Sequence, residues 1–219
     1  MYLSAAKAKL LSEVMVTLAE PHEEAQIRLR IGEQLLGLLE ADHYASFVWN
    51  DEAGVFEDRI ALNMCPRNLS AYEAYYQYHD PITSLLQQRR GPTLVGQVMP
   101  QSQLVRTEFF NDFLYRDGLY WGVNLYAWDG DRNIGDMRIW RGRRRDNFDA
   151  ESLAILELIR PAFTAALRRA RMTRPAGTAP ASAARAFQRE AEARLFKAGS
   201  PAQPTVAAPA GELSRREAE

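Results

Sequence analysis

The chain has 219 residues, and its 27 lysines and arginines against 28 aspartates and glutamates leave a formal net charge of −1. This balance argues against a chain whose own surface is a nucleic-acid footprint, so we expect no DNA-binding residues within it. The single cysteine, Cys65, excludes a disulfide framework and a cysteine-based zinc site, and the histidines are too scattered to suggest metal ligation. With no signal pattern and no apolar run near the roughly 18 residues of a membrane helix, we expect a cytoplasmic protein that needs no metal and no cofactor.

The first forty residues show the spacing of amphipathic helices. One apolar stripe runs from Leu10 to Leu18 and ends at Pro21, and a second comprises Ile27, Ile31, Leu35 and Leu38. We expect these stripes to pack on a sheet or on a partner subunit.

The next segments alternate between strand and helix patterns. Residues 45–50 and 55–62 predict a hairpin turning at Gly54. Short helices are expected over 68–78 and 82–89, separated where Asp80 precedes Pro81, because a residue before proline avoids the helical region. Residues 93–98 predict a strand and 101–116 a helix, with Gly118 as its left-handed cap.

A second hairpin is the centre of the pattern. Over 119–128 the odd positions are apolar and the even positions are aromatic or polar, and 135–141 returns with the same alternation. The apolar face should be covered by helices. The mixed face has the apolar walls and few polar groups of a small-molecule pocket, or it is simply a set of partly exposed aromatics.

Four arginines fall within residues 141–145, which we interpret as a solvated turn rather than a phosphate contact. Asp149 should then cap a long helix that contains Pro161 and ends near residue 172. Proline, alanine and glycine dominate beyond it, so we expect residues 173–211 to form a flexible linker. Within this linker, residues 183–197 could form a short helix.

These elements predict an α+β fold, an α-β-α sandwich whose antiparallel sheet of about five strands has helices on both faces. The arrangement resembles the GAF/PAS-like sensor domain of LuxR-type transcription regulators over about residues 5–170, which implies a ligand-sensing domain over residues 1–172. Tyr76 to Ile82, YQYHDPI, is similar to the tyrosine-rich helix and Asp-Pro that border the ligand cavity of those sensors, and GLYWG from Gly118 resembles their C-terminal half.

Residues 212–219 resemble the beginning of the same family's helix-turn-helix domain. In LSRREAE, Ser214 and Glu217 have the spacing of a capping box. The resemblance implies a ligand-responsive transcription regulator, seen here mainly as its sensor and cut just inside its DNA-binding domain. DNA would then be bound only through the missing domain.

The resemblance departs from the acyl-homoserine-lactone sensors at the positions that read the lactone. Where those sensors carry two tryptophans and a tyrosine, this chain has Arg67, Ala71 and Val95. Only Asp80 and Pro81 match. We therefore expect a different small organic ligand, partly aromatic or apolar and carrying one or two polar groups.

The candidate pocket residues come from the tyrosine-rich helix and from the mixed sheet face. Arg138 has two readings, a side chain that snorkels to solvent or a partner for Asp80 or a ligand carboxylate. The full set of ligand-binding candidates is Trp49, Tyr72, Tyr76, Asp80, Asn124, Tyr126, Arg138 and Trp140.

Two other functions compete with a sensor. An enzyme could use His79, Asp80 and the tyrosines for acid-base work, or Cys65 as a nucleophile, although no positioned partner is visible and we expect no catalysis. A ligand-free dimerisation module would fit the helical termini. In either case the apolar stripes over 8–18 and 153–167 predict a homodimer.

Overall fold

The computed structural model describes residues 3–173 of the chain. The expected linker, the short helix considered within it and the LSRREAE motif lie outside these residues. No helix within the described range is long and apolar enough to cross a membrane.

The sheet has five strands, all paired in antiparallel fashion in the order β2-β1-β5-β4-β3, which confirms the α+β fold expected from the sequence. Along each strand, successive side chains point to opposite faces of the sheet. Their bounds are β1 His43–Asn50, β2 Val55–Leu62, β3 Thr93–Leu94, β4 Trp121–Asp129 and β5 Arg132–Arg141.

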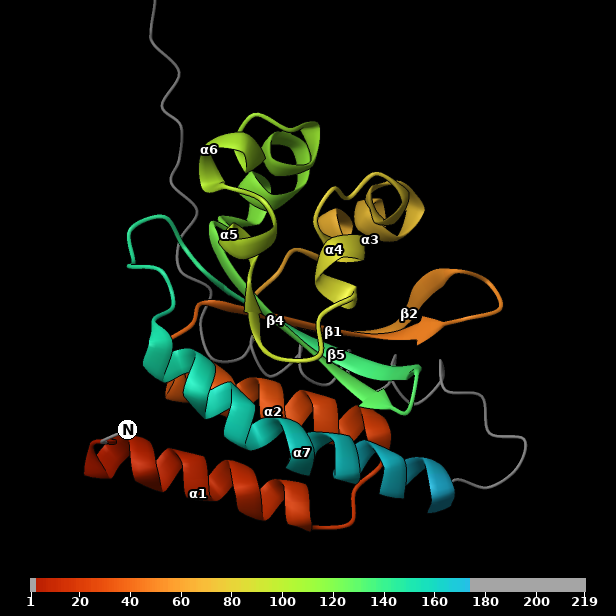
Figure 1. Ribbon diagram of the computed structural model, residues 1–219. Helices are drawn as coiled ribbons and strands as arrows, with labels where there is room; N and C mark the ends of the chain where they lie inside the picture. The colour runs from red at the N-terminus through yellow and green to blue at the C-terminus, as the bar shows by residue number, and fades with distance from the viewer. Residues whose placement is uncertain (1–2, 174–219) are drawn as a thin grey trace, which may run out of the picture.

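Three long helices cover one face of the sheet (Figure 1). They are α1 (Ala5–Ala19), α2 (Glu24–Leu38) and α7 (Ala150–Thr173), and α1 lies outermost against the other two. The odd-numbered residues of the central hairpin, such as Leu125 and Met137, are buried in this layer. Asp149 caps α7 as predicted, because its carboxylate accepts a bond of 2.8 Å from the Ser152 backbone N–H.

Short helical segments cover the opposite face in two groups (Figure 1). They bury the even-numbered aromatic residues of the central hairpin in a second core. Their bounds are α3 Pro66–Ala74, η1 Tyr76–Tyr78, α4 Thr83–Gln87, α5 Val95–Val98, α6 Gln101–Leu104, η2 Phe109–Phe113 and η3 Leu114–Asp117.

Two predicted elements in this layer are wrong in length. The strand expected over 93–98 stops after Leu94, because the Gln97 side chain accepts from the Leu94 backbone N–H at 2.8 Å and closes a helical turn. The helix expected over 101–116 breaks after Leu104. There the Thr107 hydroxyl donates to the Leu104 carbonyl at 2.7 Å and accepts from the Phe110 N–H, so it competes with the helical ladder.

Candidate functional site

A small cavity lies between the mixed sheet face and the short helices, with a volume of about 30 Å³. That is space for one or two water molecules. Its wall is mainly apolar and includes residues from three strands, β1, β4 and β5, and from four helical segments, α3, α4, η2 and η3. The lining residues are Ala45, Phe47, Met64, Leu69, Tyr72, Asp80, Ile82, Thr83, Phe109, Phe113, Leu114, Leu119, Asn124, Arg138 and Trp140.

Arg138 of β5 is the buried cation of this cavity, with 5% of its surface exposed. Its Nε donates to Asp136 at 2.8 Å and its Nη1 donates to the Tyr72 hydroxyl at 2.6 Å. The guanidinium carbon lies 4.3 Å from the ring centre of Phe56 and 4.6 Å from that of Phe47. The expectation that Arg138 snorkels to solvent is therefore wrong, because an ion pair and aromatic faces compensate its burial.

Asp136 holds the arginine where two strands separate. The pairing of β1 with β5 ends at Ala45, and β1 has an irregularity against β2 between Ser46 and Val48. The Phe47 N–H at this point donates to the Asp136 carboxylate at 2.6 Å. One carboxylate thus replaces a missing ladder bond and neutralises Arg138. Burial alone would lower the pKa of Arg138, but Asp136 and the nearby tyrosines raise it well above its usual value, so the guanidinium stays charged.

Two buried polar atoms of the cavity residues have no hydrogen-bond partner among the described residues: Nη2 of Arg138 and Oδ1 of Asn124. Asn124 is 2% exposed and its amide nitrogen donates to the Tyr126 hydroxyl at 3.3 Å. Asn124 and Arg138 are directly paired in the register of β4 with β5. A free donor and a free acceptor therefore lie side by side on one sheet face.

Asp80 lines the cavity, but its carboxylate already caps the turn at Ile82 and Thr83 that leads into α4. It accepts from the backbone N–H groups of Ile82 and Thr83 at 2.8 and 3.0 Å, and from the Thr83 hydroxyl at 2.5 Å. Burial raises the pKa of Asp80, against the lowering effect of these hydrogen bonds. Pro81 disfavours a helical backbone at Asp80, so η1 and α4 remain separate segments.

Five of the eight residues expected to bind ligand line the cavity, namely Tyr72, Asp80, Asn124, Arg138 and Trp140. Burial raises the pKa of Tyr72 to about 12, so its hydroxyl stays protonated. Of the other three, Tyr126 and Tyr76 contact lining residues, whereas Trp49 packs on a residue outside the lining. Tyr126 contacts Asn124, Tyr76 stacks on Phe113 with ring centres 5.6 Å apart, and Trp49 packs on Phe56 at 4.8 Å.

Sequence reasoning missed the aromatic wall opposite the sheet. Phe109 and Phe113 form this wall from η2, a π-helical turn. On the sheet side, sequence reasoning also missed Phe47, which lies in the irregular part of β1. It also missed Asp136, although period-two counting places that residue on the same face as Arg138. Phe109 and Phe113 are four residues apart, a spacing that could have marked them as one face.

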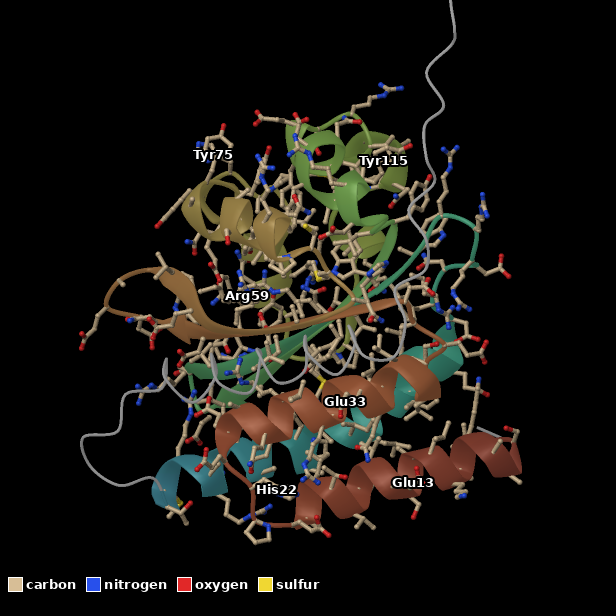
Figure 2. The ribbon with its side chains drawn as sticks, turned by 180° about the vertical axis from the view of Figure 1, so that it is seen from behind. Glu13, His22, Glu33, Arg59, Tyr75 and Tyr115 are labelled. Carbon is tan, nitrogen blue, oxygen red and sulfur yellow. The ribbon has the colours of Figure 1, made fainter. Side chains whose placement is uncertain are left out.

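The residues proposed for catalysis are not assembled. The His79 ring stacks on Tyr75 with centres 4.1 Å apart, and its Nδ1 lies 2.9 Å from the Tyr75 carbonyl oxygen. Figure 2 labels Tyr75 at the outer end of one helical group, away from the sheet. Cys65 is exposed, and its backbone N–H bonds to Asp117.

The arginines of residues 141–145 divide into two kinds. Arg143 and Arg144 are exposed beside a surface groove of about 540 Å³, as expected of a solvated turn. Arg141 instead stacks on Phe148 at 4.3 Å and donates to the Leu39 carbonyl at 2.6 Å, and Arg145 pairs with Asp42 at 2.8 Å. The turn is thus partly structural.

Neither a protein-family model nor a curated protein matches the sequence. Several solved structures share the fold. The LBD domain of VqsR from Pseudomonas aeruginosa has a TM-score of 0.56 at 16% identity, covering 78% of this chain and 100% of that one. The N-acylhomoserine-lactone-dependent LuxR-family transcription factor CepR2 from Burkholderia cenocepacia has a TM-score of 0.54 at 16% identity, covering 78% and 95%.

The GAF domain of an Acinetobacter phosphoenolpyruvate-protein phosphotransferase is equally similar, with a TM-score of 0.56 at 10% identity over 80% of this chain and 99% of that one. At such identities the likeness establishes the fold alone. The chain is GAF-like in architecture.

Proposed function

We propose that the described residues form a small-molecule sensor domain and that the whole chain belongs to a LuxR-type transcription regulator. The observation that carries this proposal is the cavity, which combines an apolar aromatic wall with buried polar groups held in place by Asp136 and Tyr72. Ligand sites have this composition. The shared fold with VqsR and CepR2 and the LSRREAE motif support the regulator assignment.

In this proposal the site binds and does not catalyse. Asp80 serves the backbone of α4, and His79 lies against Tyr75. DNA would be contacted by a helix-turn-helix domain that follows residue 212, not by residues 3–173.

Ligand binding requires the cavity to widen, because about 30 Å³ is far below the roughly 300 Å³ of a typical ligand pocket. The wall made by η2 is the part we propose to move. π-helical turns are rare in proteins and are frequent at functional sites.

A thermal-shift screen of the 219-residue protein against small, partly aromatic molecules tests the proposal. A ligand at about 100 times its Kd should stabilise the protein by roughly 2.7 kcal/mol. Ala45→Val adds methyl groups to the cavity wall and should abolish the shift. Ala162→Val on α7, on the other face of the sheet, is the matched control and should retain it. Hits that stabilise Ala45→Val as strongly as the wild type would contradict the assignment.

We also propose that the domain dimerises through the outer surface of its long helices. Most of the apolar stripe of α1 is used within the chain, since Val14 and Leu18 are buried against neighbouring helices. Val16 and Leu158 nevertheless remain 56% and 51% exposed on α1 and α7. Apolar side chains left exposed on this layer favour a second copy as the partner.

A further inference from the structure

The cavity wall contains a hydrogen-bond donor and an acceptor that the protein itself does not use. Arg138 donates from Nε to Asp136 and from Nη1 to Tyr72, whereas its Nη2 has no partner among the described residues. Oδ1 of Asn124 likewise accepts no hydrogen bond from them. Both side chains are at least 95% buried. An unsatisfied buried polar atom destabilises a fold, so a pair of them facing one cavity indicates a ligand that satisfies both.

The strand register places the two side chains next to each other, which restricts the size of the polar group they share. Asn124 and Arg138 are register partners on adjacent strands, so their side chains start about 5 Å apart on one sheet face. One compact polar group can reach both. The group needs an acceptor for the guanidinium and a donor for the amide oxygen.

Charge restricts the ligand further. Arg138 is already paired with the Asp136 carboxylate at 2.8 Å, and Asp80 is the acidic residue of the cavity lining. A ligand carboxylate would add another buried negative charge. A ligand cation would meet Arg138 and an Asp80 carboxylate that already accepts three hydrogen bonds. An uncharged ligand avoids both costs.

We infer that the cavity recognises an uncharged molecule in which a carbonyl oxygen lies next to an N–H or O–H group, as in an amide or lactam. The oxygen accepts from Arg138 Nη2, and the hydrogen is donated to Asn124 Oδ1. The aromatic wall holds the apolar remainder. This inference rests on the proposed sensor function and specifies its ligand class and the residues that read it. Asp80 has a positioning role through α4.

A matched set of five-membered rings and one acid tests the inference in the full chain. 2-Pyrrolidinone has the carbonyl and the N–H, cyclopentanone has the carbonyl only, pyrrolidinium is a cationic donor, and butyrate is an anion. Binding is followed by NMR titration of the Trp140 indole N–H, assigned by Trp140→Phe. We expect 2-pyrrolidinone to bind about tenfold more tightly than cyclopentanone, the factor expected of one hydrogen bond to a buried acceptor, and more tightly than either ion.

The variant Asn124→Leu keeps the shape of the side chain and removes the acceptor. It should reduce the preference for 2-pyrrolidinone over cyclopentanone to about one, because neither ring then has a partner for its N–H or CH₂. Asn133→Leu makes the same change at another buried asparagine, outside the cavity lining, and should leave the preference intact.

The outcomes separate this inference from the proposed function. Tightest binding by butyrate or pyrrolidinium, or equal binding of all four probes, overturns the ligand class and leaves the cavity as a binding site. The ligand class is also overturned, and the cavity remains a binding site, if a screening hit sensitive to Ala45→Val binds but none of the four probes does at about 10 mM. This concentration is generous for fragment-sized molecules. If neither probes nor screening hits bind, both proposals fail.

Discussion

At the scale of single residues, the shape of the cavity depends on how closely neighbouring residues pack against its lining side chains. Gly122 lies opposite Trp140 in the pairing of β4 with β5. A Cβ atom at Gly122 would lie 2.6 Å from Val95 Cγ2 and 2.7 Å from the Trp140 ring. The absence of a side chain at Gly122 therefore sets the position of the Trp140 indole in the cavity wall.

Gly122→Ala should lower the free energy of unfolding by about 1–3 kcal/mol, the usual cost of overpacking a core, and should shift the fluorescence of Trp140. Urea denaturation and an emission spectrum check this. Gly96→Ala is the control, because nothing lies within 4 Å of a Cβ there and alanine suits the helix α5. Equal stability of the two variants would show that the Trp140 ring is not constrained.

Asp80 has a consequence for the pH dependence of stability. Because burial raises its pKa, the folded protein binds the Asp80 proton more tightly than the unfolded chain does. The stabilisation that comes from protonated Asp80 is fully present below the pKa of Asp80 in the unfolded chain, near the ordinary value of 3.8. It is lost as pH rises through the higher pKa of Asp80 in the folded protein.

Asp80→Asn should keep the cap, since an amide oxygen can accept the same two backbone N–H groups. The free energy of unfolding of the wild type relative to Asp80→Asn should therefore fall as pH rises from below 3.8 toward neutrality. Denaturation of both proteins across this range measures the difference. A difference that grows with pH would show that the native environment favours the carboxylate. Asp80→Ala, which loses the cap, should cost about 0.5–2 kcal/mol.

At the scale of elements, the junction of β1 with β5 is the support of the site. Asp136 bonds to the Phe47 backbone where the strands separate and to Arg138 beside the cavity. The two roles belong to one fully buried side chain. Loss of Asp136 would leave an N–H group and a guanidinium without their partner.

Asp136→Ala should destabilise the protein by about 3–5 kcal/mol, the range for breaking a buried ion pair from one side. Asp131→Ala removes an exposed partner of Arg90 and should change stability by less than about 1 kcal/mol. Urea denaturation compares them. A cost below 1 kcal/mol at Asp136 would mean that water compensates Arg138 and that the site is not held by this pair.

Elements with one dominant local pattern could be predicted from the sequence. The alternation over β4 and β5 placed Asn124, Arg138 and Trp140 on one face, because a strand has only two faces. The break of the segment 101–116 could not be predicted in this way. Its apolar residues suit a helix, and the outcome depends on the Thr107 hydroxyl and on packing of Phe109 and Phe113 against tyrosines of α3 and η1. The role of Asp80 could not be predicted either, because a carboxylate before proline is compatible with a ligand contact and with a cap on the following turn.

At the scale of the whole molecule, the sheet separates two helical layers. The cavity belongs to the layer of short helices, whereas α1, α2 and α7 form the opposite layer (Figures 1 and 2). In Figure 2, Tyr115 lies at the outer end of the short-helix layer and Glu13 at the outer side of α1. A partner bound on the long helices would leave the cavity accessible.

The proposed dimer can be tested on that surface. Sedimentation should show a dimer at tens of micromolar, roughly the concentration at which a micromolar interface is saturated. Val16→Asp places a charge on the exposed part of α1 and should shift the protein to monomer without unfolding it, since Val16 is 56% exposed. Glu13→Asp, on the same helix, keeps its charge and serves as the control. A monomeric wild type at this concentration would contradict the dimer.

The alternation of β4 and β5 also bears on how such a domain can evolve. Residues 124, 138 and 140 face the cavity, whereas Val123, Met137 and Ile139 face the long helices. Substitutions at the first set can change what is recognised without altering the packing of the second. If the domain is the sensor proposed above, one hairpin can therefore acquire a new ligand preference in small mutational steps while its packing against the long helices stays unchanged.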